Sequence, residues 1–559
     1  MAAAARNGAA PAVVKGGRVL NVFTGEVYPA DIVIQGGRIA AVVPPGEGGG
    51  VEGEVLDATD RVIVPGYVEP HAHLGLLAEP VRTLEQMAAT GTTTVVADTY
   101  GFLALLPDDE CADVLDHFRS LPVLVRWFLA PQARAFVENE AELFSLERVE
   151  KFLARDDVVA VGELTRWPEV AAGEPDLLRK IAAARRRGKR VEGHGAGASP
   201  KRLQALVRNG VTSDHEAITP EQVLDRLRAG LYAMLRHSSL RPDLPHLLEA
   251  VRGPLSWSNR VMLTADGPTP VWMARHGYLD YLVRLAIEGG IAPAAAYRMA
   301  SLNPAMYYGL EWDVGSVAPG RRADLLLLRD LADPTPEVVL ASGRVVARDG
   351  QVVEPLGRVP WERYRGFRRG AWRAPSSELF RRLPEDVPTL HLENTVIVRL
   401  GGGGPAVQAA LWDWEGRQVV RARLTGLVER LGGLAGSWSP AFQMLVLGQD
   451  ADDMAAAAAR VVELGGGMCL VEGGRILWEL RLEGAGLFTD LPWPQLVQAL
   501  ERFEELMRER GYRHGELFYS LFFLGFDSLP DVRLTRRGVW DVRAQKVLYP
   551  PERLGTAAP

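Results

Sequence analysis

Cysteine is scarce in this chain. Its 559 residues include only two cysteines, Cys111 and Cys469, and these lie far apart in the sequence. That scarcity excludes a disulfide framework and a structural zinc site made of thiolates. Long apolar runs are also missing: none reaches the roughly 18 residues of a membrane span, and residues 1–6 lack the charged-then-apolar order of a signal peptide. We therefore predict a cytoplasmic protein with no membrane partner, and we interpret residues 1–6 as a frayed tail.

The chain has no excess of positive charge. Lys and Arg together number 63 against 70 Asp and Glu, which gives a net charge of −7 with histidine neutral. Proteins that bind nucleic acid usually carry a basic patch, so we predict no nucleic-acid partner. The apolar content of 47% and the charged content of 24% are typical of a globular protein. A chain of this length exceeds one compact core, and about two to four domains are expected.

Eight candidate strands, most of them separated by helical segments, follow one another in the first part of the chain. Such alternation indicates β/α units around a parallel sheet, and eight units in about 250 residues are typical of a TIM barrel. Residues 78–89 and 141–154 are examples of the predicted helices. The candidate strands are residues 61–68, 92–98, 123–129, 157–163, 189–193, 210–214, 231–236 and 260–265.

The segments on both sides of this region consist of short predicted strands. We expect residues 12–60 and 305–354 to pair in one composite β-sandwich that flanks the barrel of residues 61–304. Residues 355–385, rich in Arg, Trp and Pro, read as a linker or wrapping segment, and residues 386–559 as a separate α/β domain. The predicted fold class is therefore α/β: a (β/α)8 TIM barrel with a β-sandwich built from both flanks, plus a C-terminal α/β domain.

Two histidines follow the first candidate strand, one residue apart. In an extended segment, side chains two residues apart point to the same side, so His71 and His73 can present two imidazoles to one metal ion. A His-x-His pair alone is a weak signal, and a lone histidine or strand-end acid usually has a structural role. In a TIM barrel, however, chemistry gathers at the carboxyl ends of the strands. Further polar residues stand at those ends: Glu163, His194, His215 and Asp266.

Together these six residues form one candidate ligand set. Four imidazoles and two carboxylates suit one or two divalent transition-metal ions such as Zn, Fe or Mn. Glu163 is placed to bridge two ions, which such a carboxylate holds ~3.5–4 Å apart with a strongly acidified water between them. Asp266 can both ligate and accept the proton of the attacking water, which is the role of a general base.

Several short motifs resemble the amidohydrolase superfamily, and some resemble bacterial adenine deaminases more narrowly. The resemblance covers nearly the whole chain and extends to Ala485-Gly486-Leu487 near its end. The superfamily motifs are Pro65-Gly66, His71-x-His73, Gly91-Thr92-Thr93-Thr94, Ser301-Leu302-Asn303-Pro304-Ala305 and residues 318–324. Those similar to adenine deaminases are Gly193-His194-Gly195, Ser213-Asp214-His215-Glu216 and residues 234–239.

The resemblance implies hydrolytic deamination of adenine to hypoxanthine and ammonia at a binuclear metal centre. By position, the six residues above would be the ligands, with Glu163 bridging in place of a carboxylated lysine, since none of the six lysines ends the fourth strand. A metal-activated water would attack the amino-bearing ring carbon, and Asp266 would pass its proton to the leaving amine. Arg236, His237 and Glu216 are candidates for holding or protonating the ring, or for orienting a ligand.

The chain departs from the adenine deaminase pattern at three places. Residues 74–76 read Leu-Gly-Leu where the family usually has Glu-Ser-Ser, and residues 437–441 read Ser-Trp-Ser-Pro-Ala in place of His-Asp-Ser-His-Asn. Asp266 follows an alanine where the family has two adjacent aspartates. The metal-binding residues are thus retained while the residues expected to face the substrate differ.

The sequence leaves alternatives open. The leading hypothesis is an aminohydrolase that acts on a small molecule, adenine or a related amino-heterocycle. A cyclic amidase would use the same centre to open a ring without releasing ammonia, and a degenerate barrel would bind a ligand without catalysis. A homodimer is our expectation for the assembly, and the third domain could either cover the barrel mouth or form a subunit interface.

Overall fold

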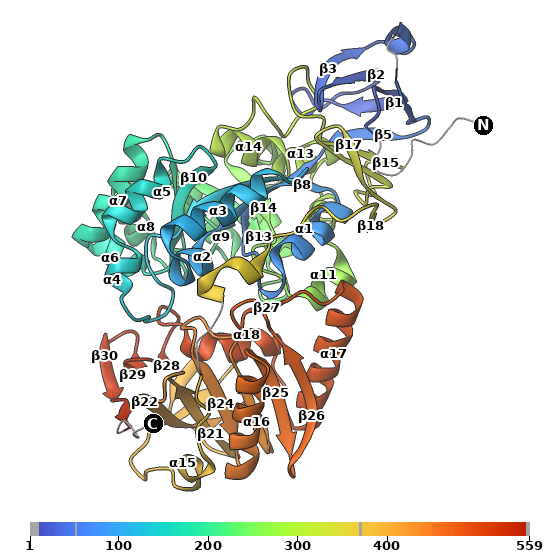
Figure 1. Cartoon of the computed structure of the whole chain (residues 1–559). Helices are drawn as coiled ribbons and strands as arrows, with labels where there is room; N and C mark the ends of the chain where they lie inside the picture. Colours follow the sequence, from blue (N-terminus) through green and yellow to red (C-terminus); the bar gives the residue numbers. More distant parts are fainter. Residues whose placement is uncertain (1–9, 51–52, 368–371, 555–559) are drawn as a thin grey trace.

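The protein consists of a barrel between two further sheets (Figure 1). The computed structural model describes residues 10–50, 53–367 and 372–554. Residues 1–6, which the sequence suggested to be a frayed tail, lie outside these ranges. No helix within the described ranges combines the length and the apolar character needed to cross a membrane.

The central sheet is an eight-stranded parallel barrel, which confirms the predicted fold class. The strands follow one another in the order of the sequence, and the first and last strands come together through a parallel bridge between Ala72 and Asp266. That closure brings the end of the first strand, with its histidines, next to Asp266. The strands are β6 (Tyr67–Ala72), β8 (Thr92–Asp98), β9 (Leu124–Leu129), β10 (Val158–Leu164), β11 (Arg190–Gly193), β12 (Ser213–Asp214), β13 (Tyr232–Arg236) and β14 (Val261–Thr264).

The first candidate strand, residues 61–68, is divided between two sheets. β5 (Val62–Pro65) pairs with strands of the outer sheet, and only β6 belongs to the barrel. The break falls at Gly66, where a Cβ atom would lie 2.1 Å from the Thr93 hydroxyl. Only glycine fits so close an approach of backbone to a neighbouring strand, and the turn starts a second strand that contains His71.

Helices follow the strands around the barrel. The segment predicted as one helix over residues 141–154 is two helices, α4 (Glu140–Leu143) and α5 (Leu146–Leu153), because Ser145 adopts an extended conformation and its side chain accepts a hydrogen bond from the backbone N–H of Arg148. The other principal helices are α1 (Pro80–Ala89), α3 (Asp108–Arg119), α7 (Pro175–Arg186), α8 (Pro200–Arg208), α9 (Pro220–Arg228), α10 (Leu244–Leu247) and α12 (Leu279–Glu288).

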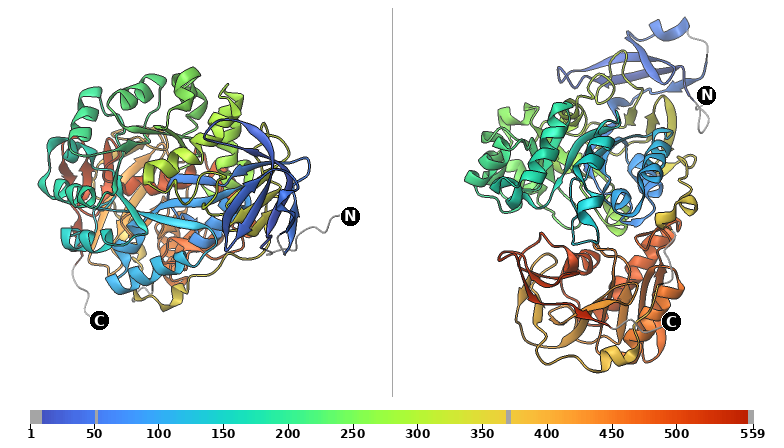
Figure 2. Two further views of the ribbon diagram at one scale, coloured as in Figure 1. Left: turned by 90° about the horizontal axis from the view of Figure 1, so that it is seen from above. Right: turned by 60° about the vertical axis from the view of Figure 1, so that its left-hand side comes forward.

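An outer sheet joins strands from both flanks of the barrel. Its own apolar core includes Val19, Ile32 and Leu325, all fully buried. Figure 2 shows this sheet standing apart from the barrel at one end of the molecule. Its strands are β1 (Val13–Leu20), β2 (Val27–Gln35), β3 (Arg38–Val43), β4 (Val55–Asp57), β5, β15 (Leu325–Leu328), β16 (Val338–Ala341), β17 (Arg344–Arg348) and β18 (Gln351–Val352).

The C-terminal domain is a mixed sheet with helices α16 (Ala451–Glu463) and α17 (Trp493–Glu509). It lies against the opposite end of the barrel from the outer sheet (Figures 1 and 2). The two bodies share a short parallel sheet of β7 (Leu77–Ala78) and β27 (Phe488–Thr489). The main strands of its sheet are β19 (Thr389–Leu392), β20 (Val398–Leu400), β21 (Ala406–Trp412), β22 (Gln418–Thr425), β23 (Gly433–Gly436), β24 (Met444–Gly448), β25 (Gly467–Glu472) and β26 (Arg475–Arg481).

The segment after β18 runs along the seam between barrel and C-terminal domain. The Trp361 ring nitrogen donates a hydrogen bond of 2.8 Å to the buried carboxylate of Glu79, which also caps α1.

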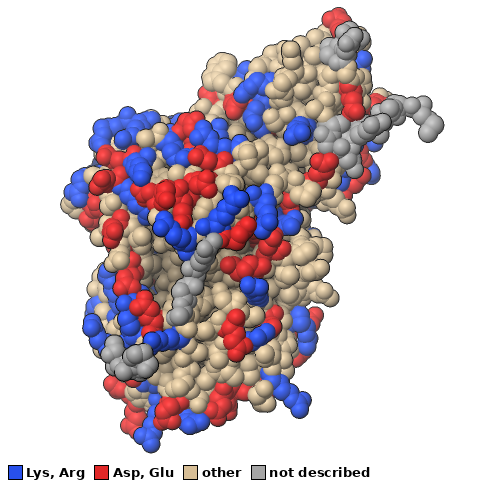
Figure 3. All heavy atoms as spheres, viewed as in Figure 1, with Lys and Arg blue, Asp and Glu red and all other residues tan. Residues whose placement is uncertain are grey.

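On the face seen in Figure 3, basic and acidic side chains are interspersed rather than separated into fields of one sign.

Candidate active site

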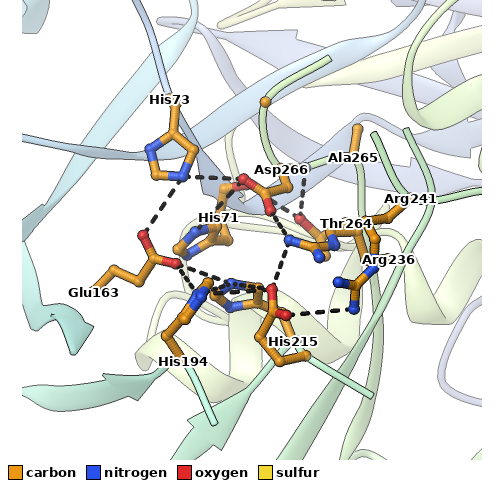
Figure 4. Close-up of polar contacts among 12 residues, drawn as sticks. His71, His73, Glu163, His194, His215, Arg236, Arg241, Thr264, Ala265 and Asp266 are labelled. Atoms are coloured by element: carbon orange, nitrogen blue, oxygen red, sulfur yellow. Dashed lines mark hydrogen bonds and ion pairs between the residues drawn. The ribbon is translucent and has the colours of Figure 1, made fainter. Parts of the chain in front are cut away.

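The six predicted ligand residues surround one space at the carboxyl ends of the barrel strands. Figure 4 shows their side chains pointing toward one another. The His73 Nε2 atom lies 3.0 Å from Asp266 Oδ1 and 3.8 Å from Glu163 Oε2. The His215 Nε2 atom lies 3.1 Å from Glu163 Oε1, and His194 Nδ1 contacts the same oxygen. The structure thus brings together residues from five strand ends that are up to two hundred positions apart in the sequence.

These side chains could hold metal ions in overlapping groups. Three sets of ligand atoms lie within 4.8 Å of one another, and Glu163 belongs to two of them: His71 with His215 and Asp266, His71 with His73 and Glu163, and Glu163 with His194 and His215. The Nε2 atom of His71 is buried and has no hydrogen-bond partner among the described residues. A buried imidazole nitrogen without a partner is costly, and a metal ion would satisfy it. The donor set therefore fits a divalent transition metal.

A second layer of carboxylates, to which no sequence motif gives a role, orients the histidines. The His71 Nδ1 atom is hydrogen-bonded at 2.7 Å to the buried Glu192, and His73 Nδ1 contacts Asp98. Such partners fix the ring orientation of metal-ligating histidines. Glu192 and Asp98 lie at the ends of β11 and β8. Their position at barrel strand ends is the one feature of the sequence that could have predicted them.

Arg134 is a third residue of the site that no sequence motif predicts. Its guanidinium lies 2.9 Å from Asp98 and 3.3 Å from Glu163, and it packs over the Tyr100 ring. It comes from the loop after β9, where no motif or periodicity marks it.

A buried ion pair fixes the two loops that carry His194 and His215. The Asp214 carboxylate accepts hydrogen bonds from the Gly195 backbone N–H and from Arg226, whose Nη2 donates to the Gly195 carbonyl at 3.1 Å. Both side chains of the pair are about 1% exposed. The pair therefore positions two candidate ligands, His194 and His215, from outside the space that they face.

We expect Arg226→Met to destabilise the protein strongly, because it leaves Asp214 as a buried charge without its ion-pair partner. Breaking one side of a buried pair costs about 3–5 kcal/mol, which chemical denaturation measures. Arg228→Met on the same helix is the matched control, since Arg228 is largely exposed and surface changes usually stay within about 0.5 kcal/mol. Equal effects of the two substitutions would contradict the role assigned to the pair.

Asp266, itself a candidate ligand, forms a charged row with Arg236 and Glu216. The Arg236 Nη1 atom lies 2.5 Å from Asp266 Oδ2 and 2.7 Å from Glu216 Oε1. Burial alone would raise the pKa of Asp266, but Arg236 and His73 outweigh it and hold that pKa well below the ordinary range. Burial likewise opposes ionisation of Glu216, yet Arg236, His194 and Arg241 lower its pKa to about 2. Both carboxylates are therefore ionised at neutral pH and can accept protons or hydrogen bonds.

His237 lies apart from this row, although it follows Arg236 in the sequence. Its ring packs against Trp272 and Tyr281, at centroid distances of 6.2 and 5.6 Å. Burial lowers the pKa of His237 to about 4, and it does not line the cavity described below. Its catalytic role stays a prediction.

A cavity opens above the ligand set, between the barrel and the C-terminal domain. Its polar floor includes His73, His194 and Asp266, while its walls are mostly apolar. The walls contain the positions at which the sequence departs from the adenine deaminase pattern: Leu74 to Leu76 on the barrel side and Trp438 to Pro440 on the other. Further aromatic side chains of the C-terminal domain complete them: Phe442, Tyr519, Phe522, Phe523 and Phe526. The C-terminal domain thus covers the barrel mouth.

Two of the candidate ligand histidines have raised pKa values in the absence of metal. Burial and Arg134 would lower the pKa of His73, but hydrogen bonds to Asp266 and Asp98 outweigh them and raise it to about 10. Burial would lower the pKa of His194 as well, whereas Glu216 and Glu163 raise it to about 9. Histidine ligates a metal ion as the neutral imidazole, so an ion that binds here must displace both protons.

Metal affinity is therefore expected to rise with pH. Below about pH 9 both rings are protonated in the metal-free form, so each pH unit of acidification should weaken binding by up to tenfold for each proton displaced. Calorimetric titration of Zn or Mn into the metal-free protein, in buffers of different ionisation enthalpy, measures both affinity and proton release. An affinity that is independent of pH between about pH 7 and 8, with no proton release, would contradict this expectation.

Comparison with known proteins agrees with this geometry. The amidohydrolase family matches residues 62–353, and the adenine deaminase C-terminal domain matches residues 397–546. The barrel and its set of histidines and carboxylates thus define a metal-dependent hydrolase of the amidohydrolase class.

Individual relatives narrow the class. The adenine deaminase of Moorella thermoacetica is 32% identical over 580 residues, which cover 96% of this chain and 95% of that protein. A protein of Halalkalibacterium halodurans, provisionally named an adenine deaminase, is 34% identical over 556 residues, covering 96% and 94%. Among solved structures, a beta-aspartyl dipeptidase of Fervidobacterium islandicum AW-1 aligns with a TM-score of 0.47 at 16% identity, over 61% of this chain and 97% of that one. These sequence relatives and the two matching family domains show that the chain belongs to the adenine deaminase family of amidohydrolases.

Proposed function

We propose that this protein catalyses the hydrolytic deamination of adenine to hypoxanthine and ammonia. The observation that carries the proposal is the convergence of four imidazoles and two carboxylates on one space, in a chain that is related over nearly its full length to adenine deaminases. The relationship suggests the substrate and the reaction. The convergent side chains provide groups that can bind metal ions and transfer protons.

The six convergent residues would hold two divalent ions, Mn, Fe or Zn, with Glu163 shared between them. When bound, such ions acidify a water molecule and polarise the group that it attacks. Glu163 suits the shared position because its two oxygens face different histidines: Oε1 faces His194 and His215, and Oε2 faces His73.

Asp266 is the proposed general base. Its carboxylate is ionised, is only 12% exposed, and borders the ligand space on the side of His71 and His73. It would accept a proton from the attacking water and deliver it to the amino group that leaves. Arg236 holds the other Asp266 oxygen at 2.5 Å, so the carboxylate keeps one orientation during the transfer.

Glu216 and Arg236 are placed to hold the heterocycle. Glu216 is an ionised acceptor on the cavity floor, suited to an N–H of a purine ring, and Arg236 is a donor suited to a ring nitrogen. The apolar walls, with Trp438 and Phe522 among their rings, offer stacking surfaces for a flat base.

The competing hypotheses are less well supported. A cyclic amidase has no counterpart among the related sequences described above, and a binding protein would not need all six ligand positions filled. Incubation of metal-loaded protein with adenine, other aminopurines, aminopyrimidines and cyclic amides separates them. We expect ammonia from adenine and no ring opening; ring-opened product without ammonia would overturn the proposal. The homodimer and the cytoplasmic location stay predictions from the sequence.

A further inference from the structure

We propose that Tyr519 of the C-terminal domain is a positioning residue for Asp266, so that the domain covering the barrel also sets the geometry of the catalytic base. The inference rests on the role given to Asp266 in the proposed function. It assigns the C-terminal domain a part in the chemistry, beyond closing the cavity.

The contact itself joins the two domains at the base. Tyr519 lies in α18 (Leu517–Phe522), is 6% exposed, and donates its hydroxyl hydrogen to the carbonyl oxygen of Gly267. Gly267 directly follows Asp266 in the chain. The Tyr519 hydroxyl is thus bonded to the backbone, and Tyr519 is one of the residues that line the cavity.

The backbone at Asp266 needs such support. Its φ of +62° lies in the left-handed region, which is unfavourable for a residue other than glycine. The Asp266 N–H donates to the Thr264 hydroxyl at 3.1 Å, and Arg236 holds the carboxylate. Tyr519 holds the next peptide on the side facing the C-terminal domain. A strained conformation persists only where its surroundings determine it fully. Of these three contacts, only that of Tyr519 comes from outside the barrel.

The packing leaves little freedom at this contact. A Cβ atom added to Gly267 would lie 2.8 Å from the Tyr519 hydroxyl oxygen and 2.9 Å from a Leu76 methyl group. The Tyr519 ring is in turn held by neighbouring rings, with Phe523 at a centroid distance of 5.1 Å and Trp438 at 6.4 Å. The hydroxyl therefore meets the Gly267 carbonyl from a fixed direction.

Two substitutions test this role in the full-length protein. Tyr519→Phe removes the hydroxyl and keeps the ring, while Gly267→Ala forces the two groups apart. We expect both to lower kcat for adenine by about 10- to 100-fold, as small displacements of a catalytic group do, with KM changed little. Because Asp266 is a proposed ligand, both should also shift the visible absorption spectrum of the Co²⁺-loaded protein.

Tyr512→Phe is the matched control. The Tyr512 hydroxyl is buried and is hydrogen-bonded at 2.7 Å to Ser520, the neighbour of Tyr519 in α18. The variant therefore loses a comparable hydrogen bond to the same helix without touching Gly267, and it should keep the wild-type spectrum and kcat. A wild-type Co²⁺ spectrum in Tyr519→Phe, or the same spectral change in Tyr512→Phe, would overturn the inference. The spectrum needs no substrate, so it decides the role of Tyr519 even if adenine is not turned over, a result that would count against the proposed function alone.

Discussion

Replacement of Asp266 by asparagine is expected to lower kcat for adenine deamination by about 10²- to 10⁴-fold, the usual contribution of a positioned proton-transfer group. Asparagine preserves the shape of the side chain but cannot accept the proton of the attacking water. It retains one oxygen that can face His73, which in the structure lies 3.0 Å from Asp266 Oδ1. The ions should therefore remain bound while turnover is lost, and steady-state kinetics together with metal analysis of the same sample measure both quantities.

A buried aspartate elsewhere in the barrel provides the control. Asp280 is 3% exposed and accepts a hydrogen bond of 2.7 Å from the Tyr278 backbone N–H, at the start of α12. It does not line the cavity, so Asp280→Asn should leave kcat unchanged, whatever it does to stability. Ammonia release that continues undiminished in Asp266→Asn would remove Asp266 from the role of base.

Replacement of Glu163 by glutamine has the second large expected effect. The carboxylate meets two histidines with one oxygen and a third with the other. A carboxylate has two negatively charged oxygens, one for each cation. A neutral glutamine amide has only one acceptor oxygen, because its NH2 group is a hydrogen-bond donor. We expect the metal content to fall from the proposed two ions to one or none. Activity should fall by more than about 100-fold, which exceeds the cost of losing a residue that only orients a ligand.

Glu192→Gln distinguishes bridging from a general loss of charge. Glu192 is also buried and contacts His71, but from behind the ring at Nδ1. Its replacement should weaken metal binding by about 10- to 100-fold, as expected for a group that orients a ligand, and both sites should still fill at high metal concentration. Two tightly bound ions in Glu163→Gln would show that Glu163 does not bridge.

The sequence predicted the barrel and the convergence of its polar strand ends for a physical reason. Parallel barrel strands are buried on both faces, so they read as apolar runs, and a polar residue at the end of such a run is conspicuous. Glu163 ends the run 158–162, and His194 and His215 follow strands five and six. The fold class is confirmed, and the structure places these residues together.

Other features could not be read from the chain because they depend on tertiary contacts. The division of residues 61–68 between two sheets depends on how closely Gly66 approaches Thr93. Arg134 comes from a loop without periodicity, and Tyr519 contacts Gly267, the residue after Asp266, from another domain 252 positions along the chain. His237 followed a residue of the site in sequence, yet strand alternation turned it toward Trp272. Adjacency in the sequence therefore does not show that two residues belong to one site, because neighbouring side chains of an extended segment point to opposite faces.

The measurement that tests the central claim most directly is the yield of hypoxanthine and ammonia from adenine, with the protein loaded in turn with Mn, Fe or Zn and compared with the metal-free protein. The claim predicts that both products form in equal amounts, and only when the ions are bound. Protein that carries its ions and leaves adenine unchanged would contradict it.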